Sequence, residues 1–416
     1  MHRRDLLLLA ALAPFSNVWA KAAADQRTPP GTIPPQRTLI LVELKGGNDG
    51  LNTLVPYTDP AYYRLRPRLA IPADEVLPLS ESIGMHPALA SLLPAWREGD
   101  LAWAQGLGYA DPNLSHFRSL DIWETASDAD ETLTVGWLAQ VLPARSDNAW
   151  PDVLTFGGGD GVAQGGALRV VTMQTPEAFV KQAERLPEDH RSVSTTSALD
   201  HVMMVDASIR QTATELQEAL LDSNDKGLPD LANTTFGRQL RQASRIILND
   251  IPVPVIKVAL AGFDTHTNQS ARHARLLTEL AEALAAFRAA MIAANRWDDL
   301  LVMTYSEFGR RVPENNQLGT DHGTAAPHLV MGGAVNGGLY GEAPALAELN
   351  QGNLRYTTEF RRVYATIAQR WWRLGEARWG QRFAPMDWLA TSGTASLGRR
   401  DAGVGESDSA CSGSYA

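Results

Sequence analysis

Residues 38–50 read TLILVELKGGNDG, and this stretch decides the class of fold. The apolar run 38–44 has no helical period and is followed at once by glycines, which predicts a buried parallel strand that opens into a loop. The alternation of such runs with helical patterns predicts an α/β fold with a mainly parallel sheet. Further strands are expected at 101–106, 152–156, 255–261, 300–305 and 328–331, and helices at 87–98, 113–123, 205–222, 234–249, 270–295 and 357–374.

Composition excludes several classes of protein. The chain has 416 residues, 37 Lys and Arg against 47 Asp and Glu, a net charge of −10 and 44% hydrophobic residues. Without a basic cluster it is not expected to bind nucleic acid, which requires concentrated Lys and Arg. The single cysteine, Cys411, excludes an intramolecular disulfide and a thiolate metal site.

The N-terminus reads as an export signal. Residues 1–24 are MHRRDLLLLAALAPFSNVWAKAAA, with paired Arg3 and Arg4 before an apolar run at 6–13. This run is shorter than the about 20 residues of a membrane-spanning helix, so no stable membrane span is expected. The paired arginines favour export by the twin-arginine machinery; ordinary secretion and a retained anchor are the alternatives. The protein is therefore expected in the periplasm or outside the cell.

The remaining chain divides by composition. Residues 1–20 form the predicted signal peptide, 21–37 a Pro-rich linker and 391–416 a small, polar tail expected to be disordered. The segment between them, 38–390, is expected to be one large α/β domain. Weak signals over 157–200 suggest an insertion or a small antiparallel region, and the insertion is placed near 157–250.

Polar clusters fall at the predicted strand ends and helix starts. In parallel sheets the functional groups gather in the loops at the carboxyl ends of strands. Carboxylates and imidazoles are the ligands that divalent ions take when no thiolate is available, so the clusters predict a metal site whose ion is Zn, Mn, Mg or Ca. The predicted metal ligands are Asp49, Asp264, His266, Glu307 and His322, and the predicted catalytic residues are Ser115 and His116.

Each of these residues also has a purely structural interpretation. Asp264 could cap the segment that follows it, and Ser115, at a helix start, could be an N-cap instead of a nucleophile. Glu307 could pair with a nearby arginine, Arg310 or Arg311. The glycine-rich loop at 46–50 lacks the Lys-Ser/Thr end of a P-loop. His86 and His328 are expected to be structural.

Several motifs together resemble a known family. They are GGNDGLN at 46–52, NLSHFRSLDIWET at 113–125, GFDTH at 262–266, TYSEFGRR at 304–311 and GTDHGTAAPHLVMGG at 319–333. In this order, behind a twin-arginine-like leader, they resemble the exported family called domain of unknown function 1501, over about residues 38–372. That family resembles the alkaline phosphatase and sulfatase superfamily. The resemblance implies a central, mainly parallel sheet with helices on both faces and a metal-dependent site at the strand ends.

The resemblance also implies a role for each candidate residue. Asp49 would be the first-strand carboxylate, Ser115 the nucleophile, and Asp264 with His266 a metal-binding pair. Glu307 would fall where the superfamily has a later Asp, and His322 where a final His approaches the metal. The chain departs from that pattern in two ways: Phe308 stands where the superfamily usually has His, and no Cys/Ser-x-Pro-x-Arg motif surrounds Ser115.

The sequence thus predicts an exported, metal-dependent hydrolase of phosphate or sulfate esters, acting on a small-molecule or polymeric ester. Because of Phe308, the alternative is a non-catalytic binding or scaffold protein of the cell envelope that keeps a degenerate metal site. A carbohydrate- or polymer-binding surface protein is a third hypothesis.

Overall fold

The computed structural model describes residues 33–34, 36–143, 150–185, 209–219, 227–375 and 380–389. The predicted signal peptide, nearly all of the predicted linker, the tail at 391–416 and Cys411 lie outside these ranges. Within them, no helix combines the length and the apolar character needed to cross a membrane.

The elements follow the alternation predicted from the sequence. The strands are β1 (Thr38–Lys45), β2 (Leu54–Val55), β3 (Leu77–Pro78), β4 (Gly84–Met85), β5 (Leu101–Gly108), β6 (Val153–Thr155), β7 (Val170–Thr172), β8 (Val255–Ala261), β9 (Leu300–Tyr305), β10 (Ala326–Met331), β11 (Gly338–Tyr340) and β12 (Thr358–Glu359). The helices are α2 (Pro60–Leu65), α3 (Leu93–Arg97), α4 (His116–Thr125), α5 (Trp137–Val141), α6 (Pro176–Ala183), α8 (Thr235–Leu248), α9 (Gln269–Ala293) and α10 (Arg361–Thr366), with residues 209–219 also helical.

The main sheet has nine strands, in the order β11-β5-β10-β9-β1-β8-β6-β7, with β12 beside β5. β1 lies at its centre and pairs in parallel with β8 on one side and β9 on the other. Successive side chains of a strand point to opposite faces, and here both faces are buried, which explains why β1 is mostly apolar. Its one buried charge, Glu43, pairs with Lys257 of β8 at 3.0 Å.

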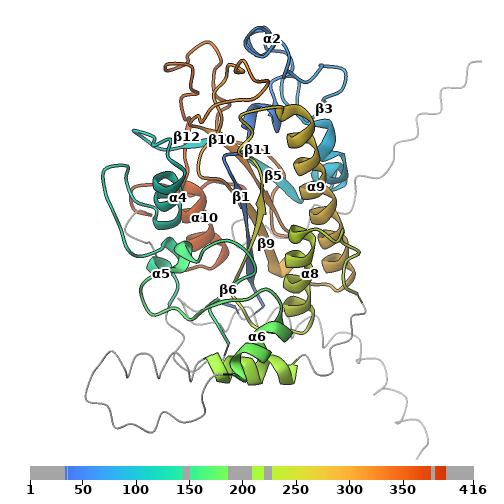
Figure 1. Cartoon of the computed structure of the whole chain (residues 1–416), viewed down its shortest axis with the longest axis vertical. Coiled ribbons are helices and arrows are strands. Elements are labelled where there is room, and N and C mark those ends of the chain that lie inside the picture. The colour runs from blue at the N-terminus through green and yellow to red at the C-terminus, as the bar shows by residue number, and fades with distance from the viewer. Residues whose placement is uncertain are drawn as a thin grey trace, which may run out of the picture.

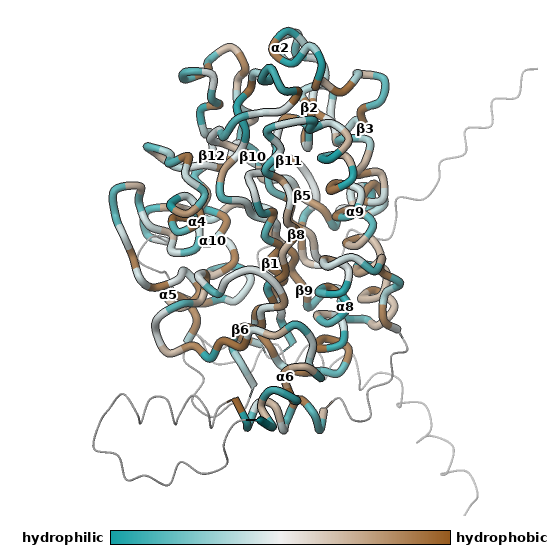
Figure 2. Tube along the Cα trace, viewed as in Figure 1, coloured by the Kyte–Doolittle hydropathy of each residue, from teal (hydrophilic) through white to brown (hydrophobic). Residues whose placement is uncertain are grey.

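Helices cover both faces of this sheet (Figure 1). On one face Ile40 and Val42 pack with residues of α8 and α9, and on the other Leu39 and Leu41 pack with residues of α4 and α10. Figure 2 shows the most hydrophobic stretches along the central strands, between the two helical layers. The predicted α/β class, with a mainly parallel central sheet and helices on both faces, is confirmed.

Two local predictions need correction. No small antiparallel region forms from the described part of 157–200: β7 instead extends the main sheet, in parallel with β6. β6 falls within the predicted strand at 152–156, whereas β7 has only three residues, too few to show a period in the sequence. The predicted final helix at 357–374 starts later and is not regular: Thr358–Glu359 form β12, and α10 begins at Arg361 and passes into a π-helical turn at Ile367–Trp371.

The two histidines expected to be structural are both buried, but only one is hydrogen-bonded. His86 accepts a hydrogen bond from the Ala88 amide at 3.0 Å. His328 packs against Trp123, and neither of its ring nitrogens has a hydrogen-bond partner. Burial lowers the pKa of His328 to about 3. This imidazole is therefore neutral in the folded protein, and no hydrogen bond replaces those that its nitrogens would make with water.

Replacing His328 with Leu is expected to stabilise the protein, and more at pH 5 than at pH 8. The substitution removes two unsatisfied nitrogens at both pH values. At pH 5 a His in the unfolded chain is protonated, whereas the folded state holds His328 neutral, so the wild type loses stability as pH falls below about 6.5. This linkage adds about 2 kcal/mol to the gain at pH 5. Chemical denaturation at the two pH values measures it, and equal gains would contradict the interpretation.

Candidate metal centre

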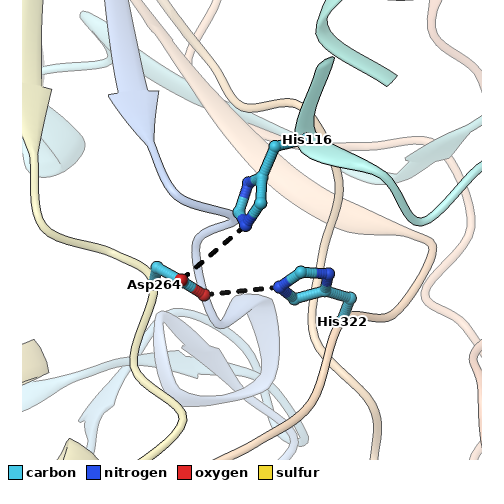
Figure 3. A group of neighbouring side chains, drawn as sticks. All are labelled: His116, Asp264 and His322. Atoms are coloured by element: carbon cyan, nitrogen blue, oxygen red, sulfur yellow. Dashed lines mark hydrogen bonds and ion pairs between the residues drawn. The ribbon is translucent and has the colours of Figure 1, made fainter. Parts of the chain in front are cut away.

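Three candidate residues from distant parts of the chain meet beyond the carboxyl ends of β8 and β9. His116 is the first residue of α4, Asp264 follows β8, and His322 lies in the loop between β9 and β10. One donor atom of each lies within 4.8 Å of the donor atoms of the other two. Figure 3 shows both imidazole rings directed at the Asp264 carboxylate.

His266 lies beside this group, close to two of its three members, although it is outside the set of three. Its Nε2 lies 3.0 Å from Asp264 Oδ1 and 3.0 Å from His322 Nε2. His322 Nε2 is 3.4 Å from Asp264 Oδ1, and His116 Nε2 is 3.7 Å from Asp264 Oδ2. Tetrahedral zinc with ligands near 2.0–2.1 Å separates its donors by about 3.3 Å, so these spacings suit one such ion.

The far side of each imidazole has its own acceptor. Glu307 Oε1 lies 2.9 Å from His116 Nδ1, and the Leu114 carbonyl oxygen lies 2.8 Å from His322 Nδ1. The Asp321 carboxylate is 3.5 Å from His266 Nδ1. A proton held on Nδ1 leaves the Nε2 lone pair free to face the centre, as it does in metal-binding histidines.

Glu307 was predicted as a ligand, but the structure places it behind His116. Its Oε1 also accepts a hydrogen bond from the Gly46 amide at 2.9 Å. Glu307 lies outside the three-residue donor group. The arrangement therefore favours an orienting role for this carboxylate.

Arg310 holds the loops of the site together. Its buried guanidinium lies 2.7 Å from Asp264 Oδ1, and it donates to the carbonyl oxygens of Gly46, Gly47, Phe263 and Thr320. Although burial opposes ionisation of Asp264, the hydrogen bond and charge of Arg310 lower the pKa of this carboxyl. The sequence suggested Arg310 only as a partner of Glu307, and its pairing with Asp264 was missed.

Asp49, the other predicted ligand, lies outside the donor group. It is fully buried, and its Oδ2 is 2.7 Å from Nη1 of Arg66 and accepts a hydrogen bond from Gln269. Burial opposes ionisation, but the charge and hydrogen bond of Arg66 lower the pKa of Asp49. Its carboxylate is therefore engaged in a buried ion pair, apart from the three donor residues.

Ser115 is the N-cap residue of α4, between Leu114 and His116, which both contact the centre. Its backbone is extended and its side chain makes no capping hydrogen bond. The residue is exposed. Ser115 thus stands at the N-cap position, but its hydroxyl does not form the hydrogen bond by which an N-cap residue stabilises a helix.

The centre is open to solvent. The side chains of its three donor residues and of His266 are between 23% and 45% exposed. The positive end of the α4 dipole lies at the same place, because α4 begins at His116. An anionic ligand could therefore approach the donor atoms and the helix N-terminus together.

Several solved structures match the chain at low sequence identity. Ps i-CgsB is 9% identical with a TM-score of 0.41, over 85% of this chain and 75% of that chain. A phosphonate monoester hydrolase from Silicibacter pomeroyi is 11% identical with a TM-score of 0.33, over 85% and 78%. A protein in the alkaline phosphatase superfamily from Vibrio parahaemolyticus is 10% identical with a TM-score of 0.30, over 75% and 65%.

Among proteins with curated annotation, none matches the sequence. A family model described as "Protein of unknown function (DUF1501)" does match, over residues 106–379, a span that includes the three donor residues of the centre and His266. The predicted family is confirmed, and the chain belongs to the DUF1501 family.

Proposed function

We propose that this protein is an exported, metal-dependent hydrolase of phosphate or sulfate esters. The observation that carries the proposal is the convergence of His116, Asp264 and His322, with His266 Nε2 3.0 Å from donor atoms of both Asp264 and His322. Ser115, whose hydroxyl makes no capping hydrogen bond, directly precedes His116 in the chain. Without a bound ion such a cluster would be unfavourable, because the nitrogens of three imidazoles and a carboxylate would face one another with few protons between them. A divalent cation satisfies all four donors at once.

The donor set narrows the choice of ion. Three imidazole nitrogens and one carboxylate suit zinc or a similar transition metal, whereas magnesium and calcium prefer oxygen ligands. When bound, such an ion polarises an ester oxygen and lowers the pKa of a nearby hydroxyl.

The chain's own residues would supply the remaining functions. Ser115 Oγ is the proposed nucleophile, and the free amides of the first turn of α4 would bind the anionic oxygens of the ester. Glu307 would keep a proton on Nδ1 of His116, and Arg310 would keep Asp264 ionised. Both act through other residues and do not touch substrate in this proposal.

Ser115→Ala tests the proposal directly. In zinc-supplemented protein the substitution is expected to lower kcat for aryl phosphates or aryl sulfates by at least about 100-fold, because it removes the nucleophile. Its metal content and Tm should remain those of the wild type, because the side chain makes no capping bond in the folded state. A variant with undiminished turnover would contradict the assignment of Ser115.

Phe308 favours a second candidate, a metal-binding scaffold protein of the cell envelope without activity. Its ring centroid lies 4.9 Å from that of His116 and 4.5 Å from that of His322, so an apolar ring fills the place of a further donor. Metal binding without turnover of any aryl phosphate or sulfate would favour this candidate over the hydrolase.

Export is part of the proposal and rests on residues 1–20. Replacing Arg3 and Arg4 together with Lys is expected to leave most of the protein in the cytoplasm, because the twin-arginine pathway requires the paired arginines. Cell fractionation and immunoblotting measure the distribution. Undiminished export of the double variant would indicate ordinary secretion.

A further inference from the structure

Several large apolar side chains that are exposed to solvent belong to residues close in sequence to the donor histidines of the proposed metal centre. Three of them lie within four residues of a donor histidine in sequence, and Phe117 is 91% exposed. A phenylalanine ring is usually buried, because burial removes its apolar surface from water, so an exposed ring is unusual. The exposed large hydrophobic residues in the described ranges are Leu114, Phe117, Ile292, Leu318 and Tyr356.

The backbone of these residues lies close to the donor residues at two points of the chain. Leu114 and Phe117 border His116 in sequence, and the Leu114 carbonyl oxygen lies 2.8 Å from His322 Nδ1. Leu318 is on the His266 side: the neighbouring Gly319 packs so closely against the His266 carbonyl that a Cβ there would lie 2.1 Å from its oxygen. We call Leu114, Phe117 and Leu318 the apolar rim.

We infer that the apolar rim binds the organic group of the substrate, so that the preferred esters are those of aryl or long alkyl alcohols. This inference rests on the proposed function. An ester whose anionic end reaches the donor atoms must place its other end just outside them, where the rim lies. A hydrophilic alcohol would gain nothing from Phe117, whereas an aromatic or alkyl group would cover it and remove apolar surface from water.

Binding of two phosphonates to zinc-loaded protein tests the inference without relying on turnover. Phenylphosphonate and methylphosphonate share the anionic group and differ in the organic group. Isothermal titration calorimetry is expected to give about a tenfold lower Kd for phenylphosphonate, a ratio that corresponds to about 1.4 kcal/mol of apolar burial. Phe117→Ala should bring the ratio close to one.

Ile292→Ala is the matched control, since Ile292 is 42% exposed but lies near the end of α9, away from the donor residues in sequence. It should keep the wild-type ratio. If both phosphonates bind equally to the wild type, the inference is wrong and the proposed hydrolase stands. If the preference persists but no ester is hydrolysed, the rim is supported and the hydrolase fails.

Two further outcomes would each contradict the inference. If neither phosphonate binds, both the inference and the proposed function are wrong. If Phe117→Ala keeps the ratio but weakens co-sedimentation with phosphatidylcholine vesicles, the rim contacts a lipid surface instead, and the inference is overturned.

Discussion

Asp264→Ala is expected to reduce zinc affinity by at least about 100-fold and to abolish ester hydrolysis. Asp264 is the carboxylate that lies within 3.7 Å of donor atoms on three histidines, so its loss removes the shared anionic partner of His116, His266 and His322. Ligand loss costs more affinity than loss of an outer partner, for which about 10- to 100-fold is typical. Equilibrium dialysis with elemental analysis measures the binding, with about one ion per chain expected for the wild type.

Asp321→Ala serves as the control for Asp264→Ala. Its carboxylate is exposed and lies 3.5 Å from the far nitrogen of His266, so a decrease of about tenfold or less is expected. Asp264→Ala should still fold, because Arg310 keeps its carbonyl acceptors, among them Gly47 at 2.7 Å and Thr320 at 2.9 Å. Wild-type zinc affinity in a folded Asp264→Ala protein would show that the ion is held elsewhere.

The central strands could be predicted from the sequence because they are buried on both faces. β8 and β9 occupy the predicted ranges 255–261 and 300–305, and β1 ends one residue beyond its predicted run. A mostly apolar run between polar loops is a strong local signal, even where it holds a buried charge such as Glu43 in β1 or Lys257 in β8. The strands β2, β3, β4, β11 and β12 have two or three residues each and carry no such signal, since their pairing is fixed by the tertiary structure.

The site could be predicted only in part, for a related reason. Strand ends and helix starts identify which polar residues approach the same edge of the sheet, and four of the predicted site residues, His116, Asp264, His266 and His322, do lie close together there. What each side chain faces depends on contacts across the sequence. Nothing near Glu307 in the sequence indicates that it would lie behind His116, which is 191 positions away.

Asp49 shows the same limit most clearly. It follows the first strand, as an expected ligand should, but its direction is set by Arg66, 17 positions further on. Arg66 lies beside α2 and has no distinguishing motif around it. Most arginines of a protein are exposed, so the sequence alone does not reveal which one of them is buried.

Arg66→Ala is therefore expected to cause the largest loss of stability, about 3–5 kcal/mol, because it leaves the Asp49 carboxylate buried without its cationic partner. It also removes the donors to the carbonyl oxygens of Val312 and Arg311, at 2.7 Å and 2.9 Å. Urea denaturation, monitored by tryptophan fluorescence, measures the change.

Arg68→Ala is the matched control: its own side chain is 50% exposed, and its partner Glu314, at 2.6 Å and 5% exposed, keeps hydrogen bonds from the backbone amides of Arg68 and Leu69. For Arg68→Ala, a decrease in the free energy of unfolding of at most about 1 kcal/mol is expected.

The Arg66 variant also separates the two interpretations of Asp49. If the Asp49–Arg66 pair is structural, the folded fraction of Arg66→Ala, isolated by size exclusion at low temperature, keeps the wild-type zinc content. If Asp49 is instead a metal ligand, Asp49→Asn should lose zinc while its free energy of unfolding in the presence of a chelator stays close to that of the wild type. The complete burial of both partners predicts the opposite for Asp49→Asn: zinc retained and stability lost.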